Sequence, residues 1–287
     1  MHTSFLSHAR GVYFWLSVIF CTGCIIAYAI HDPKPEPNGG TMLGYTLGTL
    51  GAVLILWLLY LGRRKRNFIH GWGTVRGWVS AHVYFGVSLL LVATLHSGFQ
   101  FGINIHTLAY GLMCLVIFSG IFGVWAYRTF PEARNDIKKS QSLDEIFSEL
   151  EEIDANLERM LGSVEEDIRS VVISAIDRTV VGGNLIDQLT ARDNSRVIID
   201  GHVHSNKDQT RLINWLVKRL SGAGGQESTY LTSVTQECGA RRNLLRTIRT
   251  DIRMHGMQEV WLYFHVPLSF ALLAALIAHI VSVFFYW

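Results

Sequence analysis

Residues 79–99 read VSAHVYFGVSLLLVATLHSGF, an apolar run interrupted by two histidines, His82 and His96. The run is long enough to cross a lipid bilayer as a helix, which takes about 20 residues. The two histidines are fourteen residues apart. Fourteen residues make nearly four helical turns, or about 21 Å, so both histidines face the same way.

Residues 261–287 at the end of the sequence, WLYFHVPLSFALLAALIAHIVSVFFYW, repeat this pattern. His265 and His279 are again fourteen residues apart in a run of apolar residues. Ionisable residues at membrane depth are costly and usually functional. Two parallel helices with these equal spacings would offer two stacked histidine pairs inside a membrane.

The composition supports a membrane protein. Of 287 residues, 49% are hydrophobic, and they gather in blocks long enough to span a bilayer. Five blocks are found, at residues 11–31, 42–61, 79–99, 105–127 and 261–286. We expect an all-α membrane protein with five transmembrane helices, in which residues 1–130 hold four helices, residues 131–257 form a mainly helical insert, and residues 258–287 complete the bundle.

Lysine and arginine predict the orientation. A basic cluster, RRKR at 63–66, follows the second apolar block, and further basic residues follow the fourth. The loop between the first and second blocks holds only Lys34, and the loop between the third and fourth blocks holds no lysine or arginine. Positive residues favour the cytoplasmic side. We expect a multi-pass protein of the bacterial inner membrane, with the N-terminus and the insert in the cytoplasm and the C-terminus in the periplasm.

With this orientation, His82 and His265 form an inner pair, and His96 and His279 form an outer pair. Haem iron takes axial imidazoles readily, and a helix bundle can bury the apolar macrocycle. We expect two non-covalent, bis-histidine b haems. Covalent c-type attachment is excluded at Cys21 and Cys24, because Ile25 follows where that motif needs histidine.

Further residues are candidates for contact with the haems. Small residues let a macrocycle approach a helix, and Gly48 and Gly62 are again fourteen residues apart. Arg76 and Arg128 are placed to receive the propionates of the inner haem. His106 opens the fourth block on the outer side, where three roles stay open: propionate donor, quinol proton acceptor or alternative axial ligand.

The arrangement resembles the di-haem cytochrome b family, the haem-bearing four-helix core of cytochrome bc-type quinol oxidoreductases and related membrane subunits. The resemblance covers residues 42–127 and 258–287, and the four paired histidines match the family's ligands, as Gly48 and Gly62 match one of its glycine pairs. It implies a subunit that transfers electrons across the membrane between a quinone pool and partner redox proteins of a respiratory or photosynthetic-type complex. Whether the chain is itself an enzyme stays open. The first block and the insert depart from the family, whose quinol-site motif is also lacking.

A quinone site needs a proton acceptor near a haem. His255 and Glu259 lie one helical turn apart just before the last block. Pro267 lacks an amide donor and is expected to bend the helix nearby. We hypothesise a proton-linked quinone site here, with ordinary juxtamembrane polar residues as the alternative.

The insert is predicted to be mainly helical. Apolar residues at three- and four-residue intervals predict one long helix over 142–180 with a coiled-coil-like apolar seam. The seam could dock a partner or a second copy of the chain, or it could belong to a purely structural helical hairpin. A short strand is expected within 196–204, a helix over 208–220, and a third helix from about 228 into the last block. We expect the arginine row of this third helix to be a solvated or phospholipid-facing stripe, formed by Arg241, Arg242, Arg246, Arg249 and Arg253.

Two other classes of function compete with the cytochrome. The chain could be a non-catalytic membrane anchor or assembly subunit whose cytoplasmic hairpin recruits partners, or a histidine-lined transporter of metal ions or protons. The expected partners of the first reading are membrane lipid, quinone and other redox subunits, without nucleic acid.

Overall fold

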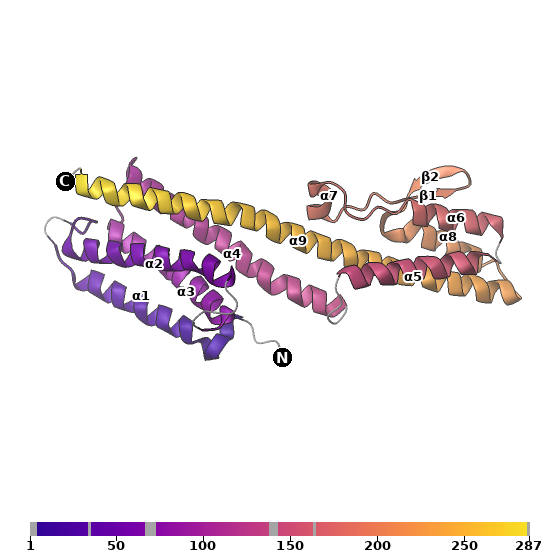
Figure 1. Ribbon diagram of the computed structural model, residues 1–287, viewed down its shortest axis with the longest axis horizontal. Coiled ribbons are helices and arrows are strands. Elements are labelled where there is room, and N and C mark those ends of the chain that lie inside the picture. Colours follow the sequence, from indigo (N-terminus) through magenta and orange to yellow (C-terminus); the bar gives the residue numbers. More distant parts are fainter. Residues whose placement is uncertain (1–4, 34–35, 67–72, 138–142, 163–164, 286–287) are drawn as a thin grey trace. The chain divides into compact units, whose positions relative to one another are not determined.

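The computed structural model describes residues 5–33, 36–66, 73–137, 143–162 and 165–285 (Figure 1). Helices make up 81% of it. The chain divides into two compact units. The first unit contains Met1–Arg128 and Trp261–Trp287, and the second contains Thr129–Val260.

The first unit is built from long apolar helices. A 3₁₀ turn, η1 (Phe5–Gly11), leads into α1, and the C-terminal part of α9 joins the unit from Trp261 onward. Among the described residues, five helices are long and apolar enough to cross a membrane, so the predicted all-α membrane protein is confirmed at this level. They are α1 (Val12–Ile30), α2 (Met42–Arg66), α3 (Val75–Ser97), α4 (Ile105–Ile137) and α9 (Gly225–Phe285).

The ends of α3 follow from its sequence. Thr74 caps the helix, because its hydroxyl accepts the amide of Gly77 at 3.1 Å. Gly98 ends it in the left-handed conformation (φ 57°), and its amide donates to the carbonyl of Leu95. Both His82 and His96 therefore lie on one uninterrupted helix, as expected.

Contacts between helices define the directions within the first unit. His106 near the start of α4 contacts His279 of α9, and Ser119 farther along α4 contacts His265, so α4 and α9 are antiparallel. Thr94 near the end of α3 bonds to Tyr110 near the start of α4, and Leu89 earlier in α3 shares a buried apolar cluster with Met113 farther along α4, so these two helices are also antiparallel. It follows that α3 and α9 are parallel, as the orientation predicted from lysine and arginine implies.

The second unit packs helices around one apolar core. It contains α5 (Leu143–Leu161), α6 (Glu166–Asp177), α7 (Leu185–Thr190), a hairpin of β1 (Arg196–Ile199) and β2 (His202–Ser205), the 3₁₀ turn η2 (Lys207–Gln209), α8 (Thr210–Leu220) and the N-terminal part of α9. Side chains from four of these helices are almost completely buried, among them Leu157, Ile168, Leu216 and Leu245. Burying each such side chain contributes about 1.5–3 kcal/mol to folding.

Two local predictions for the insert need correction. The single helix expected over 142–180 is wrong, because α5 ends at Leu161 and α6 begins at Glu166, with Gly162 in a turn after α5. The strand expected within 196–204 is a two-stranded antiparallel hairpin. Its turn is Asp200-Gly201, and both residues have positive φ (51° and 76°), as a tight type I′ turn requires.

The other predicted helices of the insert are confirmed. Residues 210–220 form α8, and α9 runs from Gly225 into the last apolar block without interruption (Figure 1). Pro267 lies inside α9.

Candidate functional site

Two of the predicted histidines face each other. The ring centroids of His96 on α3 and His279 on α9 lie 5.9 Å apart, and the ring planes are nearly perpendicular at 79°. Two imidazoles that coordinate one metal from opposite sides have centroids roughly 6 Å apart, since each metal–nitrogen bond is about 2.0–2.1 Å. The observed separation is therefore compatible with a shared metal.

A hydrogen bond orients the ring of His96. Its Nδ1 lies 2.8 Å from the carbonyl oxygen of Gly44 on α2. A carbonyl only accepts, so Nδ1 carries the proton and Nε2 keeps its lone pair. Metal-ligating histidines typically donate their other ring nitrogen to a carbonyl or carboxylate in this way.

Gly48, one turn farther along α2, provides space for this ring. A Cβ atom at Gly48 would lie 2.7 Å from Cε1 and 2.9 Å from Nδ1 of His96, too close for any side chain. The group that approaches Gly48 in this structure is thus the ring of His96, whereas the sequence predicted approach of a haem macrocycle. At Gly62, by contrast, a Cβ atom would have no described neighbour within 4 Å.

His265 is held in the same tautomer by a different acceptor. Its Nδ1 lies 2.7 Å from Oγ of Ser119 on α4. The Ser119 hydroxyl donates its single proton to the carbonyl of Val116 at 2.8 Å, so Nδ1 of His265 must be the donor in the other bond. Nε2 of His265 again keeps its lone pair.

An indole ring packs against this second histidine. The ring centroids of Trp261 and His265 lie 5.2 Å apart, and Nε1 of Trp261 donates to the carbonyl of Ser119 at 2.8 Å. A Cβ atom at Gly123 would collide with the indole, so glycine there serves the tryptophan. Sequence reasoning missed Ser119 and Trp261.

The inner pair is supported by a common register. An offset of 183 residues relates His96 to His279, and the same offset relates His82 to His265. Between these positions, Leu89 and Leu272 also differ by 183 and belong to one buried apolar cluster. Because α3 and α9 are parallel, continuation of the register of His96 with His279 would bring His82 to the level of His265.

The remaining predicted site residues are more dispersed. His106 lies at the start of α4 and contacts His279, whereas Arg76 is exposed in the first turn of α3. Arg128 lies on α4, and its side chain is outside the described part of the structure. His255 and Glu259 are on α9 within the second unit, where His255 lies 3.6 Å from Asp251.

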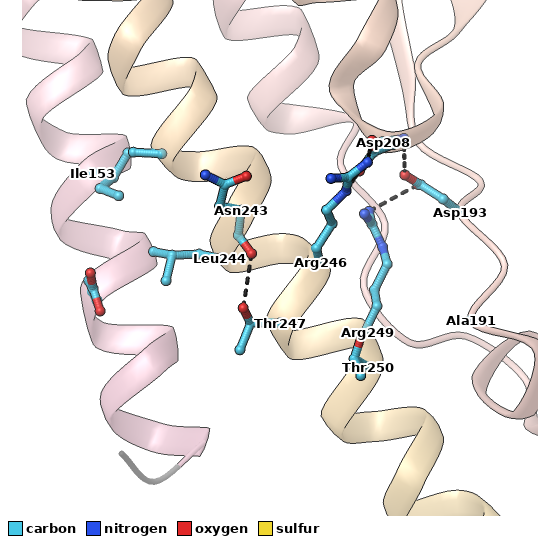
Figure 2. A pocket seen from close by; sticks show the side chains of 12 residues that line it. Ile153, Ala191, Asp193, Asp208, Asn243, Leu244, Arg246, Thr247, Arg249 and Thr250 are labelled. Atoms are coloured by element: carbon cyan, nitrogen blue, oxygen red, sulfur yellow. Dashed lines mark hydrogen bonds and ion pairs between the residues drawn. The ribbon is translucent and has the colours of Figure 1, made fainter. Parts of the chain in front are cut away.

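The second unit contains a cleft of about 750 Å³ lined by residues of α5, α9 and the loops before β1 and α8 (Figure 2). Arg246 and Arg249, one turn apart on α9, each reach an aspartate there. Arg246 makes two bonds to Asp208, which raise the pKa of this exposed guanidinium. Arg249 is buried and lies 3.0 Å from Asp193; burial lowers its pKa, and the aspartate acts in the opposite direction.

The expectation that the arginine row forms a solvated or phospholipid-facing stripe is therefore wrong for two of its members. Besides Arg249, Arg241 is 3% exposed and makes two bonds to Asp154 on α5. The row ties α9 to the rest of the second unit.

No family model, curated protein or solved structure matches this chain in any of the three comparisons made. Among the described residues, no group of three or more histidine, cysteine or acidic side chains is arranged to hold a metal ion. A haem iron takes two axial ligands, because the porphyrin supplies the other four.

Proposed function

We propose that this chain is a di-haem b-type membrane cytochrome subunit similar to the cytochrome b family. The facing pair of His96 and His279 carries the proposal. The parallel register extends the pairing to His82 and His265, and the bonds to Gly44 and Ser119 leave Nε2 of His96 and of His265 unprotonated, with a lone pair that can be donated to a metal. These nitrogens fit the axial positions of haem iron.

With both axial positions taken by imidazole, a haem passes single electrons and leaves no open position for oxygen chemistry. The residues of this chain hold and orient the ligands. Helices α3 and α9 keep two histidine levels fourteen residues apart, which separates the levels by about 21 Å along the helix axes. Two levels at that separation support electron transfer from one side of a membrane to the other.

The electron donor and acceptor in this proposal are a quinone pool and partner redox subunits of a respiratory or photosynthetic-type complex. The distribution of lysine and arginine supports a bacterial inner-membrane location with the N-terminus and the second unit in the cytoplasm. His255 and Glu259 are our candidates for a quinone-linked proton site, with Arg76, Arg128 and Gly62 as candidate contacts of the inner haem.

The decisive test is a reduced-minus-oxidised spectrum of the purified full chain together with its haem content. We expect a b-type spectrum and about two haems per chain. His96→Ala and His279→Ala should each remove one haem, whereas His204→Ala in the second unit, whose ring contacts Arg211, should remove none. A haem-free chain that stays stable and functional after both substitutions would instead favour a membrane anchor or assembly subunit.

A further inference from the structure

His106 and His279 share a hydrogen bond between identical ring atoms. Their Nδ1 atoms lie 2.5 Å apart, the ring centroids are 4.5 Å apart, and the planes are perpendicular at 89°. The contact joins the first turn of α4 to the last turns of α9. Of the proposed ligands, His279 thus has another imidazole as its partner.

The start of α4 holds His106 in place. The side chain of Asn104 accepts the amide of Thr107 at 2.9 Å, as a helix cap does. The hydroxyl of Thr107 in turn accepts the amide of Gly102 at 3.1 Å. These bonds on both sides of His106 fix the backbone from which its ring reaches α9.

One proton lies between the two Nδ1 atoms, because a hydrogen bond needs one donor and one acceptor. If Nδ1 of His106 were the donor, Nδ1 of His279 would accept with its lone pair, and Nε2 of His279 would carry the proton and be unable to bind iron. If Nδ1 of His106 accepts, Nδ1 of His279 carries the proton and Nε2 is free. Iron ligation by Nε2 of His279 therefore requires His106 to be the acceptor.

We infer that His106 is a positioning residue that accepts the Nδ1–H of His279 and holds it in the tautomer that presents Nε2 to the outer haem. The inference rests on the proposed function. It gives His279 the same kind of support that Gly44 gives His96 and Ser119 gives His265. It gives His106 a role other than propionate donor, quinol proton acceptor or alternative axial ligand, since a ring engaged in this bond supports a ligand.

The test compares His106→Leu, which removes the acceptor, with His106→Gln, whose side-chain carbonyl can accept the same proton. Both are made in the full chain, and haem content, low-spin spectra and the midpoint potentials of the two haems are measured. Leu108→Ala serves as the control, because Leu108 is an exposed residue in the same turn of α4.

Accepting a hydrogen bond from a ligand imidazole raises its basicity, which favours ferric iron. We expect His106→Leu to shift the potential of one haem to more positive values, or to lose that haem, and His106→Gln to restore the wild-type value. Unchanged potentials in His106→Leu would overturn the inference. Loss of one haem in both His106 variants, while His279→Leu keeps two haems, would also overturn it, because His106 and not His279 would then be the ligand. A wild-type chain without haem would refute the proposed function instead.

Discussion

Ser119 accepts a hydrogen bond from Nδ1 of His265 across 2.7 Å while its own proton goes to the carbonyl of Val116. One hydroxyl thus sets both the orientation and the tautomer of a proposed haem ligand. Partners of this kind are worth a 10–100-fold change in metal affinity in typical metal sites.

Ser119→Ala should therefore weaken binding of one haem by roughly 10–100-fold and leave the other unaffected. The measurement is haem retained per chain during dilution or competition with an apo-protein acceptor. Ser269→Ala is the matched control, because the Ser269 hydroxyl donates to the backbone carbonyl of His265. Equal retention in both variants would argue against a role for Ser119.

Gly48→Ala should displace the ring of His96, since the new Cβ would lie 2.7 Å from Cε1. Overpacking of this kind typically costs about 1–3 kcal/mol, and here the cost falls on a ligand. We expect haem content to fall from two toward one per chain. Gly23→Ala on α1, where a Cβ would have no described neighbour within 4 Å, should keep both haems. Full occupancy in Gly48→Ala would mean that the ring of His96 tolerates displacement.

The sequence predicted the large features because their signals are local. Apolar blocks of bilayer length indicated five helices, and the equal histidine spacing together with the lysine and arginine distribution predicted the parallel arrangement of α3 and α9 and the contact of His96 with His279. Hydropathy and helical periodicity depend only on residues within one element.

The partners of these residues could not be predicted in the same way. Ser119 lies 146 residues from His265, and the aspartates that pair with the arginine row lie 38 to 87 residues from their partners. Such pairs form only when tertiary packing joins distant elements. The break between α5 and α6 was missed because the apolar periodicity outweighed Gly162, whereas the Asp200-Gly201 turn had a local signal in its two residue types.

The two arginines of the cleft should differ sharply in their contribution to stability. Arg249→Met leaves Asp193, whose side chain is only 10% exposed, without its cation, and breaking a buried pair costs about 3–5 kcal/mol. Arg246→Met removes a pair whose arginine is 59% exposed, which is worth about 0–1 kcal/mol. Hydrogen exchange of the amides at 193–209 in the full chain measures both effects. Comparable protection in the two variants would contradict the assignment of Arg249 as a structural residue.

Cys238 provides a prediction for alkaline pH. Its side chain is 2% exposed in the core of the second unit, and burial raises the pKa of its thiol from 9.0 to about 12. The folded state therefore favours the neutral thiol. The contribution of the Cys238 thiol to the free energy of unfolding is fully present below pH 9. It is lost as the pH rises from 9 to 12, by at most about 1.4 kcal/mol per pH unit, because the unfolded state releases the proton first. We expect Cys238→Ala to flatten the decline of stability in this window, measured by urea unfolding of the full chain, while Cys114→Ala, in the first unit, leaves it unchanged.

Because alkylation needs an accessible thiolate, Cys238 should also resist iodoacetamide at pH 8 until the second unit unfolds, and rapid labelling of the folded chain would contradict its burial.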